Sequence, residues 1–257
     1  MKAINYHIKA IISSLNALSK GKYLVYFIPG TIITLIYFFL TYKAKSVIDT
    51  IDLETGYSWV DYFGGYVDKG LEKTFSFFGM ITEQIYIFVI ITLLSPFNTV
   101  LGEKFDEELT GTNFKGGIIR FINDFFRMFF LVLLLIIFEL FFIFIYWVIS
   151  WLFGLESIDP IIYHLIAAFF FGISFYDFSL ERYEKGVFSS IGFAFTYPLS
   201  MIITGSIFLL IYQIPIIGIP IAPVLSILFS TVVYLYLTKK LPKINQVNPD
   251  KSEILTK

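Results

Sequence analysis

The most constraining feature of this chain is an uninterrupted apolar stretch at residues 128–153, MFFLVLLLIIFELFFIFIYWVISWLF. It contains 26 residues and a single charged side chain, that of Glu139. As a helix it reaches about 39 Å, more than the roughly 30 Å hydrocarbon core of a bilayer. A soluble domain does not need a helix this apolar on every face. The stretch therefore predicts a membrane-spanning helix, with lipid as the solvent for the chain.

The composition supports this interpretation and excludes several classes of function. Of the 257 residues, 57% are hydrophobic and 15% are charged, which argues against a disordered chain and against a soluble enzyme. The net charge of −1 and the lack of a basic patch predict no nucleic-acid partner. There is no nucleophile elbow, phosphate loop or cluster with metal-ligand spacing. We predict neither an enzyme nor a metal or cofactor site.

Apolar segments separated by polar ones predict an all-α integral membrane protein with long transmembrane helices and helical hairpins. Residues 1–22 are predicted to form an amphipathic interfacial helix and a basic turn, and residues 239–257 a polar cytoplasmic tail. The membrane domain, residues 23–238, contains six apolar segments, at 23–42, 80–94, 128–153, 160–180, 187–213 and 224–237. A polar stretch at 43–78 separates the first two segments.

The N-terminal segment has the periodicity of an amphipathic helix. Its apolar side chains recur at helical spacing and form one stripe, consisting of Ile4, Ile8, Ile11, Leu15 and Leu18. Such a helix either lies in the membrane interface or packs on the protein's own inner surface. Gly21 is placed to end it.

The distribution of positive charge predicts a topology in which both termini are cytoplasmic. Four of the 19 Lys and Arg residues lie in the 43–78 stretch, on the predicted outer side. The other 15 fall on the inner side if the N-terminus is inside: Lys2, Lys9, Lys20, Lys22, Lys104, Lys115, Arg120, Arg127, Arg182, Lys185, Lys239, Lys240, Lys243, Lys251 and Lys257. This bias agrees with the positive-inside rule. A hairpin that dips halfway into the bilayer would give the same pattern.

Local signals predict where individual helices begin, end and meet. Ser95 followed by Pro96 predicts a helix start, and Gly111 a helix end. The acidic residues between 103 and 108 are expected to form a solvated helix face. Pro198 should interrupt the segment at 187–213. Ala168 and Gly172, four residues apart, predict a surface where another helix approaches closely.

Two polar residues lie inside predicted membrane segments. Glu139 is a functional candidate because a carboxylate at mid-membrane is costly. In a helical hairpin it would lie at the same depth in the membrane as Ser174 on the next segment. The alternative is a neutral, hydrogen-bonded acid that only joins two helices. His164 is expected to be hydrogen-bonded or interfacial rather than a metal ligand. Asp177 and Arg182 are expected to form a pair at the membrane edge.

Two stretches indicate that the protein handles an anion. Residues 214–223, IPIIGIPIAP, contain Pro215, Gly218, Pro220 and Pro223, which predict irregular backbone before the last helix. Irregular backbone at membrane depth lines a path or is buried in protein. The basic turn of Lys20, Gly21 and Lys22 offers positive charge at a membrane edge. Together they predict recognition or passage of an anion, although a turn that only packs gives the same pattern.

Several short motifs, in this order, resemble the CysZ sulfate-permease family, which includes the eukaryotic etoposide-induced membrane proteins. They cover most of residues 1–238 and comprise Gly21 with Pro29; Ser95-Pro96-Phe97-Asn98 with Gly102-Glu103-Lys104; Leu109-Thr110-Gly111; Phe175-Tyr176-Asp177; Gly192-Phe193; and Ile214-Pro215 with Ala222-Pro223.

The resemblance implies a helical, oligomeric protein of the bacterial inner membrane that admits sulfate, with some hairpins crossing only half of the bilayer. It also implies that the anion binds at the first turn, here Lys20, Gly21 and Lys22. The family's two arginines at that turn are replaced by Tyr23 and Leu24. This replacement favours a second interpretation, a membrane scaffold or regulator of the same fold that transports nothing.

Overall fold

A computed structural model describes residues 2–36, 39, 59–114 and 118–241. These residues form helices joined by short turns, with no strand among them. The elements are α1 (Lys2–Ser19), η1 (Leu24–Tyr26), α3 (Trp59–Thr110), α4 (Ile118–Phe153), η2 (Glu156–Ile158), α5 (Asp159–Arg182), α6 (Val187–Thr196), α7 (Pro198–Tyr212) and α8 (Gly218–Leu237). A further apolar helix occupies Leu24–Ile36.

The described helices confirm an all-α membrane protein. Four of them are long and apolar enough to cross a bilayer, and the bent pair of α6 and α7 could form a fifth span. The predicted stretch at 128–153 lies within α4, whose Phe141, Phe144 and Trp151 side chains are 57, 58 and 74% exposed. An exposed aromatic face of this size is compatible with lipid and not with water. Residues 40–58 and 242–257, which include much of the polar stretch at 43–78 and most of the predicted tail, lie outside the described residues.

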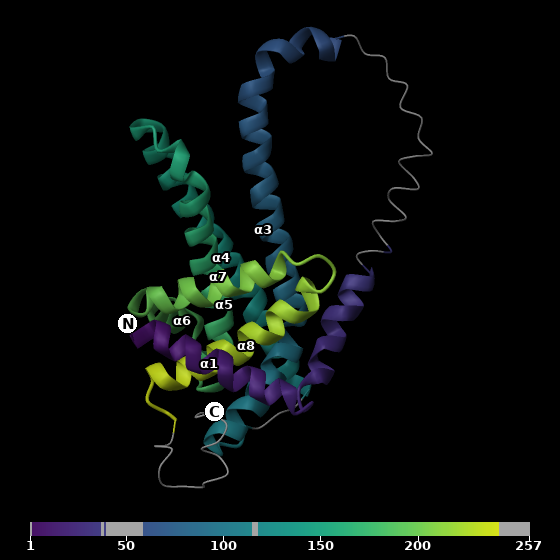
Figure 1. Cartoon of the computed structure of the whole chain (residues 1–257), viewed down its shortest axis with the longest axis vertical. Coiled ribbons are helices and arrows are strands. Elements are labelled where there is room, and N and C mark those ends of the chain that lie inside the picture. Colours follow the sequence, from purple (N-terminus) through teal and green to yellow (C-terminus); the bar gives the residue numbers. More distant parts are fainter. Residues whose placement is uncertain (1, 37–38, 40–58, 115–117, 242–257) are drawn as a thin grey trace.

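The bundle has one end at which the predicted cytoplasmic segments meet. Figure 1 shows the turn after α1 and the C-terminal end of α3 at this lower end, with the α4–α5 turn at the opposite end. Lys22 forms an ion pair with Glu108 of α3 at 3.0 Å. The Tyr183 hydroxyl, after α5, donates to Asp106 of α3, and the Lys240 ammonium lies 2.9 Å from the centroid of the Tyr183 ring. The side of the membrane that this end faces stays a prediction.

One of the two helix boundaries predicted around α3 differs from the structure. α3 continues through Pro96 instead of starting there, and it ends as predicted before Gly111, which has a φ of +74°. A proline inside a membrane helix is tolerated when neighbouring helices pack around the freed carbonyl. α3 has such neighbours, because it packs against α4, α5 and α8.

The predicted break at Pro198 and the predicted close contact of α5 are both confirmed. α6 and α7 meet at an angle of 100° at Tyr197, and Pro198 takes the first position of α7. A Cβ atom added to Gly172 would lie 2.2 Å from the carbonyl oxygen of Met201 in α7. One added to Gly205 of α7 would lie 1.8 Å from the carbonyl oxygen of Ala168. The two backbones therefore touch through their smallest residues.

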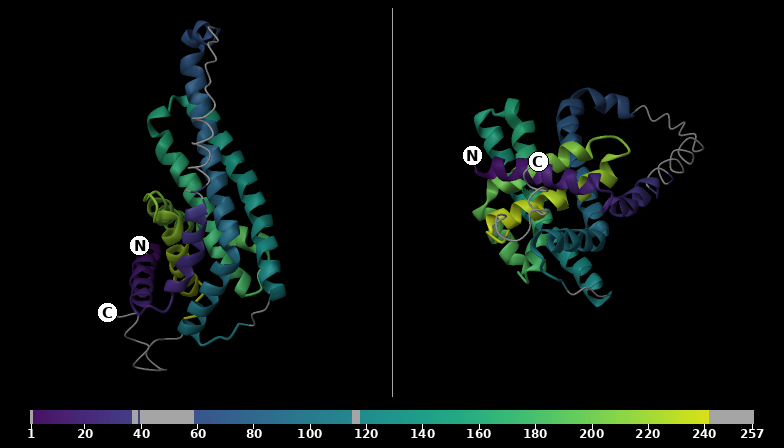
Figure 2. Two further views of the ribbon diagram at one scale, coloured as in Figure 1. Left: turned by 90° about the vertical axis from the view of Figure 1, so that its right-hand side faces the viewer. Right: turned by 60° about the horizontal axis from the view of Figure 1, so that its bottom comes forward.

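α1 packs on the bundle mainly through its small and polar side, while Ile11 and Leu18 are the members of its apolar stripe that also pack against the core. It lies across α7 and α8 and runs transverse to α3 and α4 (Figures 1 and 2). The residues it buries are His7, Ala10, Ser13, Ser14 and Ala17. Of the apolar stripe, Ile4, Ile8 and Leu15 are each more than half exposed. The helix is thus attached to the protein and also presents an apolar face, as an interfacial helix does.

The buried face of α1 is fixed by a chain of three hydrogen-bonding side chains. The His7 Nδ1–H donates to the Ala3 carbonyl oxygen at 2.8 Å, so the neutral ring accepts at Nε2 from the Thr204 hydroxyl at 2.9 Å. The Tyr176 hydroxyl lies 3.2 Å from the same Thr204 oxygen and donates to it. Burial lowers the pKa of His7 below its ordinary value.

The His7 contact predicts a loss of stability at acidic pH. The unfolded histidine has a pKa of about 6.5, above that of the folded one, so protons bind the unfolded state first as the pH falls. Stability is full above about pH 6.5 and falls by up to about 1.4 kcal/mol per pH unit until the folded pKa is reached. Thermal unfolding of wild type and His7→Gln between pH 7.5 and 5 measures this difference.

The other histidine of the chain, His164, supplies the control. His7→Gln should flatten the pH dependence of the melting temperature, and His164→Gln, measured in parallel, gives the effect of removing an imidazole outside the α1 contact. Equal pH profiles for wild type and His7→Gln would contradict the assigned contact.

Candidate functional site

The predicted basic turn is formed, but a carboxylate already neutralises part of its charge. Gly21 has a φ of +75° and ends α1 as predicted, with open space where a side chain would be. Lys20 and Lys22 are exposed, and Lys22 pairs with Glu108, which also accepts a hydrogen bond from the Tyr23 hydroxyl. Burial and this hydrogen bond raise the pKa of Tyr23. An anion at this turn would lie beside Glu108.

The predicted irregular stretch at 214–223 is shorter than expected. Pro215 lies in an exposed turn, but α8 begins at Gly218 and includes Pro220 and Pro223. The first turn of a helix needs few backbone donors, which lets Pro220 fit there. A Cβ atom on Gly30 would lie 2.6 Å from the Pro220 Cα, so the helix at Leu24–Ile36 packs directly on this end of α8.

In the described part of the structure, the basic turn and the stretch at 214–223 do not form one site. Gly30, which contacts Pro220, follows Gly21 by nine residues of mostly helical chain. At about 1.5 Å per residue the two sites are separated by roughly 13 Å along that helix. A path that uses both regions would have to run along the helix at Leu24–Ile36.

The two predicted intramembrane residues have different surroundings. Glu139 is only 2% exposed and faces α3, where Gln84 is its polar neighbour. Although Ser174 is predicted to lie at the depth of Glu139, the two do not form a hydrogen bond, since the Ser174 hydroxyl and the Glu139 Oε1 atom are both buried without a hydrogen-bond partner. His164 is half-buried on α5. No group of three His, Asp or Glu side chains in the described part of the chain could hold a metal ion.

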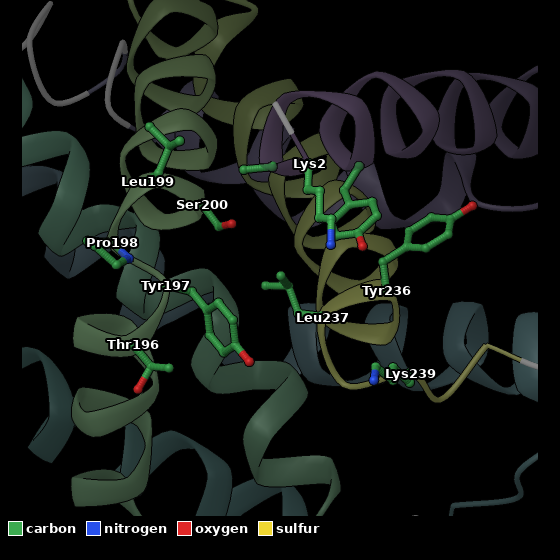
Figure 3. Close-up of a pocket in the computed structure, with 11 residues that line it drawn as sticks. Lys2, Thr196, Tyr197, Pro198, Leu199, Ser200, Tyr236, Leu237 and Lys239 are labelled. Atoms are coloured by element: carbon green, nitrogen blue, oxygen red, sulfur yellow. The ribbon is translucent and has the colours of Figure 1, made fainter.

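A cavity between the described helices lies where α1, the α6–α7 bend and the C-terminal end of α8 meet. Its volume is about 380 Å³. We call it the lysine pocket, and it is lined by Lys2, Ala3, Tyr6, Thr196, Tyr197, Pro198, Leu199, Ser200, Tyr236, Leu237 and Lys239. Figure 3 shows the Lys2 ammonium and the hydroxyls of Ser200 and Tyr197 directed toward the space between these helices.

The lining of the lysine pocket favours a negatively charged ligand. Its described lining residues include two lysines and three hydroxyl-bearing residues of α6, α7 and the bend between them, and no acidic residue is among them. The N-terminus of α7, which begins at Pro198, adds the partial positive charge of a helix start. Tyr6 and Tyr236 stack with ring centroids 5.1 Å apart and form an aromatic wall, with the Lys9 ammonium 5.7 Å from the Tyr236 ring centroid.

Sequence reasoning did not find the lysine pocket, because its charged residues are 237 positions apart in the chain. Lys2 and Lys239 become neighbours of one cavity only because α1 packs along α8. The signal available in the sequence was weak. It consisted of a lysine at the start of an amphipathic helix and a lysine cluster after the last apolar segment.

A buried arginine centre was also missed. The side chains of Arg182 and Asp106 are fully buried, with Nε and Oδ2 3.4 Å apart. Arg182 Nη2 donates to the hydroxyls of Ser179 at 2.8 Å and Thr231 at 3.0 Å. Gly102, one turn before Asp106, provides the space for the guanidinium, because a Cβ atom there would lie 1.9 Å from Nη1.

The arginine centre corrects two predictions. The acidic face at 103–108 is not fully solvated, since Asp106 has no exposed surface. Asp177 pairs with Arg127 of α4, at 2.7 Å, and not with Arg182, and it also accepts a hydrogen bond from Ser190. Both ion pairs join residues that are at least 50 positions apart in the chain. A glycine four residues before an aspartate on a membrane helix was the only local signal for the arginine centre.

Comparison with known proteins finds no matching family model, no similar curated protein and no similar solved structure. The resemblance to the CysZ family therefore stays a prediction from the motifs.

Proposed function

We propose that this protein binds a small inorganic oxyanion such as sulfate in the lysine pocket and admits it across a bacterial inner membrane. The observation that carries the proposal is the pocket itself, in which Lys2 and Lys239 line one cavity of about 380 Å³ and none of the other described lining residues is acidic. Charge-assisted hydrogen bonds from ammonium groups and hydroxyls are the usual means of holding an oxyanion.

The motif resemblance supports the same class of ligand and an oligomeric permease. The proposal moves the binding residues, however, from the basic turn to the lysine pocket. Lys22 is already paired with Glu108, while no carboxylate of the described part of the chain lines the lysine pocket. Both regions belong to segments that are predicted to be cytoplasmic, so each could serve as the inner opening of a path.

A membrane scaffold of the same fold is the second candidate. The interior between α3, α5 and α7 is filled by aromatic side chains, with ring centroids of Phe88 and Phe171 4.4 Å apart and those of Phe175 and Phe208 4.8 Å apart. Rings packed at these distances leave no polar route through that part of the bundle. A scaffold needs none, whereas a permease would have to open these contacts or conduct between subunits.

Binding of radiolabelled sulfate to the purified protein tests the proposed site. We expect the double substitution Lys2→Ala/Lys239→Ala to weaken binding by at least about tenfold, since each lost charged contact contributes about 1.5–3 kcal/mol. The matched variant Lys20→Ala/Lys22→Ala removes the same charge from the basic turn and should change the affinity less than about threefold, because the basic turn is not the proposed site.

If Lys20→Ala/Lys22→Ala weakens sulfate binding more than Lys2→Ala/Lys239→Ala does, the anion binds at the basic turn. Wild-type protein that is folded and binds neither sulfate nor phosphate would contradict the proposal and favour the scaffold.

A further inference from the structure

Glu139 lies near the middle of α4 with no partner among the described residues. The candidate span of this helix is Ile122–Phe153, so Glu139 is about equally far from both of its ends. The residue is 2% exposed, and its Oε1 atom is buried without a hydrogen-bond partner. At least one oxygen of this carboxyl group has therefore been taken out of water without gaining a hydrogen bond from the described part of the protein.

A small cavity lies directly beside this carboxyl group, between α3 and α4. It is lined by Gln84, Ile85 and Phe88 from α3 and by Ile136, Glu139 and Leu140 from α4. Glu139 and Gln84 are the polar members among its described lining residues, and its volume is about 10 Å³. A cavity of this size is about the smallest that holds one water molecule, which also needs two or more polar partners. The two side chains together supply such partners.

The membrane interior determines the charge state of this group. An ionised carboxylate in a low-dielectric environment is costly unless a cation or several donors surround it. α4 has no basic residue between Met128 and Phe153, and the cavity offers one neutral amide. The neutral acid avoids the cost and can donate a hydrogen bond to a water molecule or to the amide oxygen.

We propose that Glu139, Gln84 and one water molecule form an intramembrane proton-binding site in which the carboxyl group stays protonated at neutral pH. The site lies between α3 and α4 and shares no residue with the lysine pocket. It is therefore independent of the proposed anion binding, and each can fail without the other.

A hydrophobic carbodiimide such as dicyclohexylcarbodiimide tests the site, because it reacts from the lipid with protonated carboxyl groups. The carboxyl proton passes to one carbodiimide nitrogen while the carboxyl oxygen bonds to the central carbon. The acyl group then moves from this oxygen to the second nitrogen, which breaks the carbon–oxygen bond and leaves an N-acylurea. No atom is lost, so the labelled peptide gains the mass of one reagent molecule.

We expect the full-length protein in liposomes at pH 7.5 to be labelled at Glu139 more than about tenfold faster than at exposed Glu156, and Glu139→Gln to abolish the label. A water-soluble carbodiimide should reverse this order. Labelling of Glu156 alone by both reagents would overturn the proposal.

Infrared spectroscopy tests the part of the proposal that concerns Gln84. The carbonyl-stretch band of protonated carboxyl groups should lose one component in Glu139→Gln, and this component should shift to higher frequency in Gln84→Leu, which removes the amide partner. Absence of this component in wild type, or an unshifted component in Gln84→Leu, would contradict the assignment.

Discussion

Replacing Gly205 by alanine is expected to reduce the free energy of unfolding by about 3 kcal/mol, because a single methyl group cannot fit between α5 and α7. The added Cβ atom would lie 1.8 Å from the carbonyl oxygen of Ala168 and 2.6 Å from its carbonyl carbon. Both contacts are with backbone, which cannot move without displacing α5. Thermal or denaturant unfolding of the purified protein in detergent would measure the loss.

Gly192→Ala provides the matched control. This glycine lies in α6, and a Cβ atom there meets nothing within 4 Å. Alanine also has the higher helix propensity, so the control is expected to be neutral or slightly stabilising. Equal stability of the two variants would show that the backbones of α5 and α7 are not in contact.

Removal of one partner of the arginine centre is the second prediction with a large effect. We expect Arg182→Met to lower the free energy of unfolding by about 3–5 kcal/mol, because it leaves the Asp106 carboxylate buried without its counter-ion. Asp106 has no exposed surface, and its remaining protein donors are the hydroxyls of Tyr183 and Thr110. The unfolding assay used for Gly205→Ala also measures this loss.

The double variant Arg182→Met/Asp106→Leu distinguishes the ion pair from simple packing. An apolar pair of similar volume often replaces a buried ion pair at little cost, so the double variant should regain most of the lost stability. Lys22→Ala, which breaks the exposed ion pair with Glu108, should cost less than about 1 kcal/mol. If the double variant is as unstable as the sum of its single variants, the charges of Arg182 and Asp106 are not coupled.

The sequence predicts those parts of the fold that depend on local physics. The apolar stretch at 128–153 appears within α4, Pro198 separates α6 from α7, and Ala168 and Gly172 mark the surface where α5 approaches α7. Each of these features follows from length, backbone chemistry or residue size within a few positions. Packing against neighbouring helices therefore changes these three features only slightly.

Features that depend on which helices become neighbours could not be predicted from one sequence. Pro96 lies inside α3, where α4, α5 and α8 surround the helix and remove the reason for a new start. Lys2 and Lys239 share a cavity, and Arg182 pairs with Asp106, because distant segments pack together. For the same reason, the sequence predicts an ion pair of Asp177 with Arg182, the nearest arginine in the chain, whereas the structure pairs it with Arg127.

The most direct test of the central claim is the uptake of radiolabelled sulfate into liposomes that contain the purified protein. We predict saturable uptake in wild type, with a rate reduced at least about tenfold by Lys2→Ala/Lys239→Ala and much less by Lys20→Ala/Lys22→Ala. Chloride and phosphate, measured in parallel, define the selectivity. If folded wild-type protein takes up no more sulfate than empty liposomes do, the protein is not a sulfate permease. The scaffold would then be the better interpretation.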